Sequence, residues 1–193
     1  MREIIETSIK NSIEVKQNIL KTPSLLEAIE KAAITIINSY QTKGKTLFCG
    51  NGGSAADAQH LAAELSGRFY YDRAPLPSEA LHVNTSYLTA VANDYSFDDV
   101  YSRYVKAVGQ QGDVLVGLST SGNSMNVIKA FKIAKSLGMK TIAFTGSSGG
   151  KMHNLVDILI NVPSDDTPRI QESHIVIGHI ICQIVESTLF PKE

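Results

Sequence analysis

Five short apolar segments recur along the chain, and stretches with helical spacing separate most of them. They are residues 46–50, 79–83, 113–119, 140–146 and 157–162. Short apolar strands that alternate with helices predict a mainly parallel, five-stranded sheet with helices on both faces. We therefore expect a doubly wound α/β fold, in which ligands bind beyond the carboxyl ends of the strands.

Two helical segments precede the first of these strands. Apolar residues at near-helical spacing occupy residues 2–21, and Thr22 and Pro23 supply an N-cap and a first-turn proline for a second helix that ends near Gly44. These helices add to the α/β unit. We expect residues 1–44 to form an N-terminal extension whose apolar face packs on another subunit.

Composition and charge narrow the classes of function. The 193 residues suit a single domain, 1–193, and the net charge of −1 with scattered basic residues argues against a nucleic-acid partner. No apolar run approaches the ~20 residues that span a bilayer, and the N-terminus has no signal-peptide pattern, so we expect a cytoplasmic protein without a membrane partner. Cys49 and Cys182 are expected to be reduced, buried thiols.

Two loops with unusual composition follow predicted strands. Residues 50–53 contain three glycines, and residues 119–124, STSGNS, place four hydroxyl side chains around one glycine. Each loop leads into a helix, whose free N–H groups and dipole attract an anion. Helix capping explains one hydroxyl in such a loop but not four. We therefore expect residues 119–124 to bind a phosphate group.

The first loop also matches the dinucleotide pattern G-x-G-x-x-G/A through Gly50, Gly52 and Ala55. A dinucleotide site needs an acidic residue about 20 positions later, at the end of the next strand. Asp72 instead lies in a predicted loop, well before that strand, and neither glycine loop carries a Walker lysine. A phosphate monoester therefore fits better than a dinucleotide or a nucleoside triphosphate.

Four side chains on two helices offer nitrogen and oxygen ligands. His60 and Glu64 share one helix face at i and i+4, and Gln171 and His179 lie along one side of the last helix. Together they form a mixed set for a divalent ion such as zinc, although glutamine is a poor zinc ligand. Spacing alone favours the simpler interpretation, an exposed His–Glu pair with polar residues at a helix start.

Other polar residues carry weaker signals. Arg68 lies one turn beyond Glu64, in reach of a substrate phosphate or hydroxyl or of a solvated salt bridge. Asn93 and Asp94 fall where a helix should end, and capping accounts for them. The remaining histidines are interpreted as structural or exposed: His82, in a predicted strand, His153 and His174.

Four motifs together resemble the phosphoheptose isomerases of the sugar isomerase (SIS) family. They are GNGGSAADAQHLAAELSGRF, NDYSFDDVYSRYV, GDVLVGLSTSGNSMNVIKA and TPRIQESHIVIGHIIC. The resemblance runs from about residue 25 to the C-terminus. It implies a flavodoxin-like SIS fold, usually assembled as a homotetramer. The implied activity interconverts sedoheptulose 7-phosphate and glycero-manno-heptose 7-phosphate, the first step toward activated heptose for lipopolysaccharide core or other surface glycans.

The same resemblance implies roles for individual residues. One zinc ion per subunit would be held by His60, Glu64, Gln171 and His179, with Glu64 and His179 also carrying the proton transfers. The implied substrate contacts, each with the expected residue type here, are Asn51, Gly52, Gly53, Asn93, Asp94, Ser119, Thr120, Ser121, Ser124 and Gln171. Pro168 departs from members of the family that carry an acidic residue at this position.

The alternative to an enzyme is a non-catalytic SIS protein. A similar SIS group binds the bacterial replication initiator, and its members lack the equivalents of Glu64 and His179. This chain has both residues, which favours the enzyme. The alternative is a binding protein of that kind, or a sugar-phosphate sensor that uses the same phosphate loops.

Overall fold

The computed structural model describes residues 1–192, which contain one five-stranded, all-parallel sheet. Its strands are β1 (Thr46–Gly50), β2 (Ser78–Ala80), β3 (Val114–Leu118), β4 (Lys140–Thr145) and β5 (Ile158–Asn161). Their order is β2-β1-β3-β4-β5, the order of flavodoxin-like sheets, in which the winding reverses between β1 and β3. The predicted fold class is confirmed.

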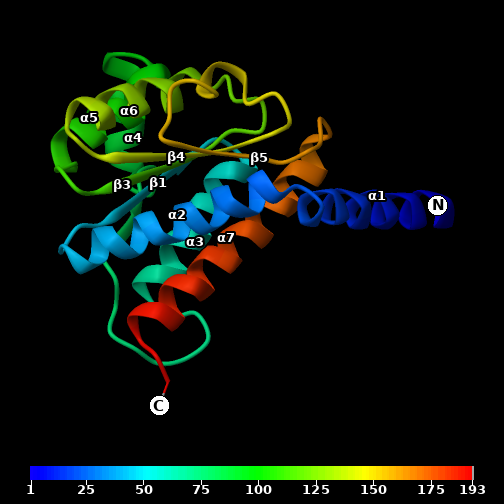
Figure 1. Cartoon of the computed structure of the whole chain (residues 1–193). Coiled ribbons are helices and arrows are strands. Elements are labelled where there is room, and N and C mark those ends of the chain that lie inside the picture. The colour runs from blue at the N-terminus through cyan, green and yellow to red at the C-terminus, as the bar shows by residue number, and fades with distance from the viewer. Residues whose placement is uncertain (193) are drawn as a thin grey trace.

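Helices cover both faces of this sheet (Figure 1). One face carries α2 (Pro23–Gln41), α3 (Gly53–Ser66) and α7 (Thr167–Leu189). The other carries α4 (Thr85–Asp94), α5 (Val100–Val108) and α6 (Met125–Ser136). Two short 3-10 helices, Phe97–Asp99 and Gly150–Met152, lie in the connections.

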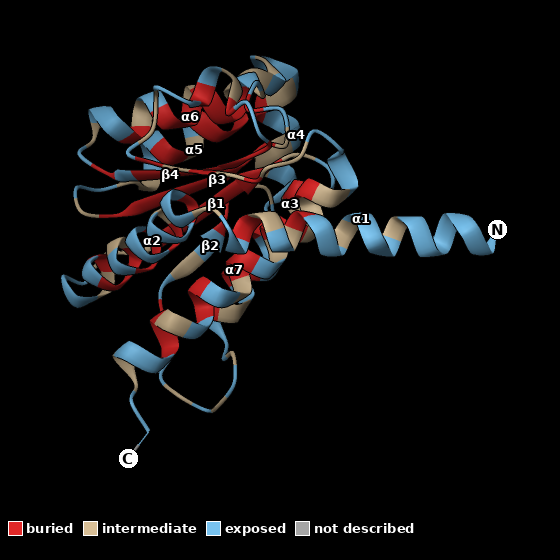
Figure 2. Cartoon of the chain, turned by 45° about the vertical axis from the view of Figure 1, so that its right-hand side comes forward, coloured by how far each residue is buried: buried red, intermediate tan, exposed pale blue. Residues whose placement is uncertain are grey.

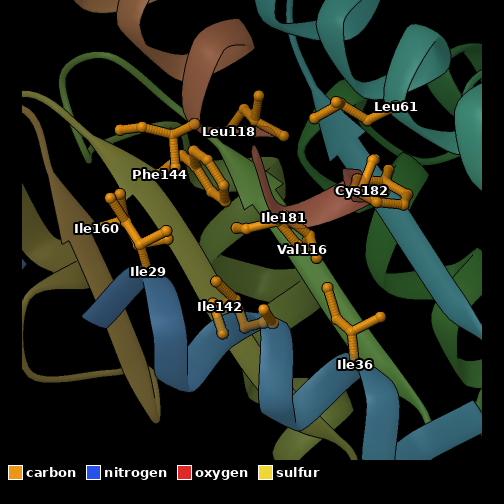
Figure 3. Close-up of a cluster of buried hydrophobic side chains, with 14 of the residues drawn as sticks. Ile29, Ile36, Leu61, Val116, Leu118, Ile142, Phe144, Ile160, Ile181 and Cys182 are labelled. Atoms are coloured by element: carbon orange, nitrogen blue, oxygen red, sulfur yellow. The ribbon is translucent and has the colours of Figure 1, made fainter. Parts of the chain in front are cut away.

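Alternate residues of each strand fill two separate cores. Phe48 and Val116 point toward α2, α3 and α7, whereas Leu47 and Leu115 point toward α4, α5 and α6. Figure 3 shows the first core, where side chains of β3, β4 and β5 meet those of α2 and α7. Because helices cover both faces, the central strands are apolar throughout. The continuous apolar runs in the sequence therefore predict these strands.

The two cysteines lie in different cores, and both are buried and free, as the sequence predicts. Burial raises the pKa of the Cys182 thiol to about 12, because a low-dielectric environment disfavours the thiolate. Burial also raises the pKa of Cys49. Both groups are therefore protonated core thiols at neutral pH.

The edge strand β2 is shorter than the predicted strand 79–83, and that prediction was wrong in its bounds. Ser78–Ala80 pair with β1, but Leu81 and His82 form a turn. The physical reason is the start of α4 shortly afterwards, where the Asn84 side chain accepts a hydrogen bond from the Tyr87 backbone N–H at 3.0 Å. His82 therefore lies outside the strand.

The N-terminal helix α1 (Arg2–Leu20) projects from the rest of the chain, and most of its length is exposed (Figure 2). Helix α2 begins at Pro23 as predicted but ends at Gln41, before Gly44, and Lys43 takes a left-handed φ of 64°. Thr22 is the N-cap residue of α2, as predicted, but its hydroxyl donates to the Asn18 carbonyl at 2.8 Å and makes no capping bond. Within residues 1–192, no helix is long and apolar enough to cross a membrane.

Candidate functional site

The carboxyl ends of β1 and β3 bring the two predicted loops together at the point where the winding of the sheet reverses. The Asn51 side chain, just after β1, and the Asn126 side chain, on α6, exchange two amide hydrogen bonds of 2.9 Å each. Gly52 has a φ of 57° and open space beside it, so a ligand can approach its backbone. This edge is where flavodoxin-like sheets bind ligands.

The hydroxyl-rich loop lies beside a polar cavity of about 290 Å³. Thr120 and Ser121 line one side of this cavity, and Ser147 and Ser148, after β4, line another. Within the loop, the Ser119 and Ser124 hydroxyls are 2.9 Å apart and share a hydrogen bond. The cavity therefore offers hydroxyl donors near a helix N-terminus, which suits a phosphate group, and the Asp165 carboxylate, bonded to the Ser147 hydroxyl, also lines it.

His60, Glu64 and His179 form one cluster. The His60 Nε2 atom lies 2.8 Å from Glu64 Oε1 and 3.4 Å from His179 Nε2. One ligand atom from each residue lies within 4.8 Å of the other two. Two imidazole nitrogens that face each other beside a carboxylate form the His₂Glu donor set of catalytic zinc sites. The simpler interpretation, an isolated exposed His–Glu pair, does not describe this arrangement.

Close packing of α3 against α7 produces this cluster. A Cβ atom at Gly178 would lie 2.5 Å from Leu61 Cδ2, and a Cβ atom at Gly53 would lie 2.6 Å from Gln171 Nε2. The two helices thus run side by side in the same direction. Gln171 lies beside the first glycine loop, about 12 Å of helix rise before His179, so a single chain does not bring it into the cluster.

Three further residues, all exposed, were predicted to contact the substrate. Arg68, Asn93 and Asp94 are exposed, and the Asn93 amide donates to the Asp94 carboxylate at 2.9 Å near the end of α4. In the part of the chain that the structure describes, hydrogen bonds connect none of the three to the phosphate loops or to the His–Glu–His cluster.

His174 is buried in the core, in agreement with a structural role. Its Nε2 atom lies 3.1 Å from the Thr145 carbonyl oxygen, and its ring lies edge-on to Phe144. Burial lowers its pKa to about 4, and the bond to Thr145 opposes that shift only partly. The ring is therefore neutral at physiological pH.

The sequence does not predict a role for three side chains around the cluster, those of Asp57, Arg73 and Glu186. Asp57 lies one turn before His60 on α3, and burial raises the pKa of its carboxyl against the opposing effect of the two cluster histidines. The spacing of Asp57, His60 and Glu64 along one helix was the signal that could have found it. Arg73 and Glu186 form a buried ion pair with a separation of 113 residues, which no local pattern reveals.

Comparisons with known proteins identify the family of the chain. The model of the SIS domain matches residues 9–146. The phosphoheptose isomerase of Clostridium acetobutylicum is 53% identical over 193 residues, which cover 100% of this chain and 98% of that protein. The structure of the phosphoheptose isomerase from Neisseria gonorrhoeae is 46% identical, with a TM-score of 0.91 and coverage of 96% of this chain and 98% of the other. The corresponding structure from Francisella tularensis is 38% identical, with a TM-score of 0.92 and coverage of 96% and 97%.

Proposed function

The chain belongs to the SIS domain family and, within it, to the phosphoheptose isomerases, and from this premise we propose its substrate and mechanism. The substrate pair is D-sedoheptulose 7-phosphate and D-glycero-D-manno-heptose 7-phosphate. This reaction would be the first step toward activated heptose for lipopolysaccharide core or another surface glycan. The observation that carries the proposal is the meeting of Glu64 with two histidines, in a chain whose hydroxyl-rich loop lines a separate polar cavity.

The proposed chemistry follows from what an aldose–ketose isomerisation requires. A proton moves between C1 and C2, and the two oxygens on these carbons exchange protons. Glu64 would act as the base that removes the carbon-bound proton and returns it to the neighbouring carbon. His179 would give protons to, and take them from, the oxygens. Both groups are partly shielded from solvent.

The phosphate loops would serve the reaction by holding the far end of the substrate. Hydroxyls of Ser119, Thr120, Ser121 and Ser124 would bind the phosphate, and binding energy spent there fixes C1 and C2 against the cluster. Further substrate contacts are proposed at Asn51, Gly52, Gly53, Arg68, Asn93, Asp94 and Gln171.

The cluster also supports a proposal of one zinc ion per chain. His60, Glu64 and His179 offer two nitrogens and one oxygen within 4.8 Å of one another, which fits this ion. Zinc bound there would supply a Lewis acid that polarises the sugar carbonyl. Zinc ligation by Gln171 stays a prediction. Within one chain the Gln171 side chain lies beside Gly53 and not in the His–Glu–His cluster.

We also propose a cytoplasmic homotetramer. Ile4, Ile5, Ile9 and Ile13 of α1 are all more than half exposed, and a groove of about 420 Å³ with apolar walls lies between α1, α2 and α7. Exposed apolar surface of this extent favours self-association. Light scattering should give a mass four times the 20.9 kDa of one chain, and a monomer would contradict the proposal.

The decisive experiment compares Glu64→Gln with the wild type on sedoheptulose 7-phosphate. Turnover should fall by about 10²- to 10⁴-fold, the usual contribution of a general base, while the thermal unfolding curve stays close to that of the wild type. Glu79→Gln is the matched control, because Glu79 is an exposed carboxylate on β2. Equal turnover in Glu64→Gln and wild type would remove Glu64 from the mechanism.

The same assay tests the non-catalytic alternative. A sensor or a binding protein of the replication-initiator type would bind the sugar phosphate, as calorimetry would record, but wild-type protein would form no aldose from it. Wild-type turnover excludes a purely non-catalytic role.

A further inference from the structure

We propose that the buried Arg73–Glu186 ion pair is a positioning element that sets Glu64 and His179 for proton transfer, an inference that rests on the proposed isomerase function. Arg73 lies in the loop between α3 and β2, and Glu186 lies on α7. Their side chains are 2% and 1% exposed, and Arg73 Nε lies 3.1 Å from Glu186 Oε1. Neither residue belongs to the set assigned above to substrate or metal.

Arg73 binds the end of the helix that carries Glu64. Its Nη2 atom donates to the carbonyl oxygen of Glu64 itself at 2.8 Å, and its Nη1 atom donates to the carbonyls of Leu65 and Gly67 at 2.8 and 2.9 Å. The last carbonyls of a helix have no partners within the helix, and a planar guanidinium can satisfy several of them at once. Arg73 thus holds the backbone of Glu64 directly.

Glu186 acts on the other side of the cluster. Its two carboxylate oxygens accept hydrogen bonds from the backbone N–H groups of Phe69, at 2.9 Å, and Tyr70, at 2.7 Å. The ring of Phe69 lies against the ring of His179, with 5.5 Å between their centroids. Glu186 therefore holds Phe69 in place, and Phe69 limits the positions that the His179 imidazole can take.

One ion pair consequently constrains both proposed catalytic groups. Arg73 reaches Glu64 through its carbonyl, Glu186 reaches His179 through Phe69, and the salt bridge between them joins the two sets of contacts. Catalysis by positioned groups is sensitive to displacements of about 1 Å, which cost about 10²-fold in rate. Loss of either charge should therefore act on turnover and not only on stability.

A matched control is available in a second buried ion pair. Asp113, just before β3, pairs with Lys45 Nζ at 2.7 Å and accepts the backbone N–H groups of Lys45 and Gln110 at 3.0 and 2.9 Å. Its side chain is 2% exposed. Asp113 is thus a buried, ion-paired carboxylate with two backbone donors, as Glu186 is, but its partners Lys45 and Gln110 lie outside α3 and α7.

The test compares Glu186→Gln and Asp113→Asn at a temperature where circular dichroism shows both to be folded. Both variants should unfold at lower temperature than the wild type. Glu186→Gln should lower kcat for sedoheptulose 7-phosphate by about 10- to 100-fold with KM nearly unchanged, whereas Asp113→Asn should keep the wild-type kcat. Equal kcat values in the two variants would overturn the positioning role.

A second readout does not depend on turnover. In protein with ¹³C-labelled histidine, the ring-proton signals of His179 sense the ring of Phe69 and should shift in Glu186→Gln and in Phe69→Leu, but not in Asp113→Asn. Unshifted His179 signals in Glu186→Gln would refute the inference even if the wild type had no isomerase activity. Absent wild-type turnover with shifted signals would refute the proposed function alone.

Discussion

Gly178 controls how closely α7 approaches α3. A single methyl group there should lower kcat strongly and the free energy of unfolding only slightly. A Cβ atom at this position would lie 2.5 and 2.6 Å from the two terminal carbons of Leu61, which is 1% exposed and has little room to move. Ordinary van der Waals contact begins at 3.4 Å. Gly178→Ala should therefore push the two helices apart locally by about 0.9 Å, the difference between 2.5 and 3.4 Å.

The expected cost in stability is small because two effects oppose each other. An extra methyl group in a packed core costs about 1–3 kcal/mol, while alanine in place of glycine inside a helix contributes about 1 kcal/mol. The free energy of unfolding should fall by at most about 2 kcal/mol. His179 is the next residue along α7, and its displacement from His60 and Glu64 should lower kcat by about 10- to 100-fold.

Urea unfolding and the isomerase assay on Gly178→Ala measure the two quantities. Leu61→Ala in the same chain removes the clashing carbons, so the double variant should regain most of the lost kcat, although the deleted core side chain destabilises it by about 2–5 kcal/mol. Leu61→Ala alone is the control. A wild-type kcat in Gly178→Ala, or no recovery in the double variant, would refute the packing argument.

Two further predictions concern pH and the phosphate loop. His174 has a pKa of about 4 when folded against an ordinary value of 6.5, so between these values only the unfolded chain gains the proton. Urea unfolding at pH 7 and pH 5 should therefore show a loss of about 2 kcal/mol that a His174→Gln variant lacks, and an equal loss in both proteins would contradict the shift. Gly122 has a φ of 65°, and a Cβ there would lie 2.1 Å from the Gly149 carbonyl oxygen, so Gly122→Ala should distort the loop. Its KM should rise by about 10-fold, equivalent to about 1.4 kcal/mol of binding, while Gly112→Ala, at a φ of 90° in open space, should leave KM unchanged.

The fold could be predicted from the sequence because the signals that specify it are local. Strand β1 occupies the predicted residues 46–50, since a strand buried on both faces is apolar from end to end. Helix α6 ends at Ser136, and Gly138 follows with a left-handed φ of 76°, a conformation that glycine commonly supplies just after a helix. The edge strand β2 was harder to delimit, because it pairs on one side only and ends at a turn.

The candidate site could be predicted in parts but not as an arrangement. The two glycine loops and the spacing of His60 and Glu64 were visible, yet spacing alone favoured an exposed surface pair. The 3.4 Å between His60 and His179 depends on α3 and α7 packing together across 119 residues of sequence. Arg73 and Glu186 could not be predicted for the same reason. They are 113 residues apart in sequence, and only the tertiary structure shows that they pair with each other.

The sequence by itself determined the periodicities, and through them the strands, the helices and the chemical character of two loops that favour an anion. Only the tertiary structure decided which side chains meet. Helix periodicity fixes the direction of a side chain about its own axis, whereas the distance between two helices depends on the shapes that touch, here the bare Cα of Gly178 against Leu61. That contact is what places a carboxylate and two imidazoles within 4.8 Å of one another.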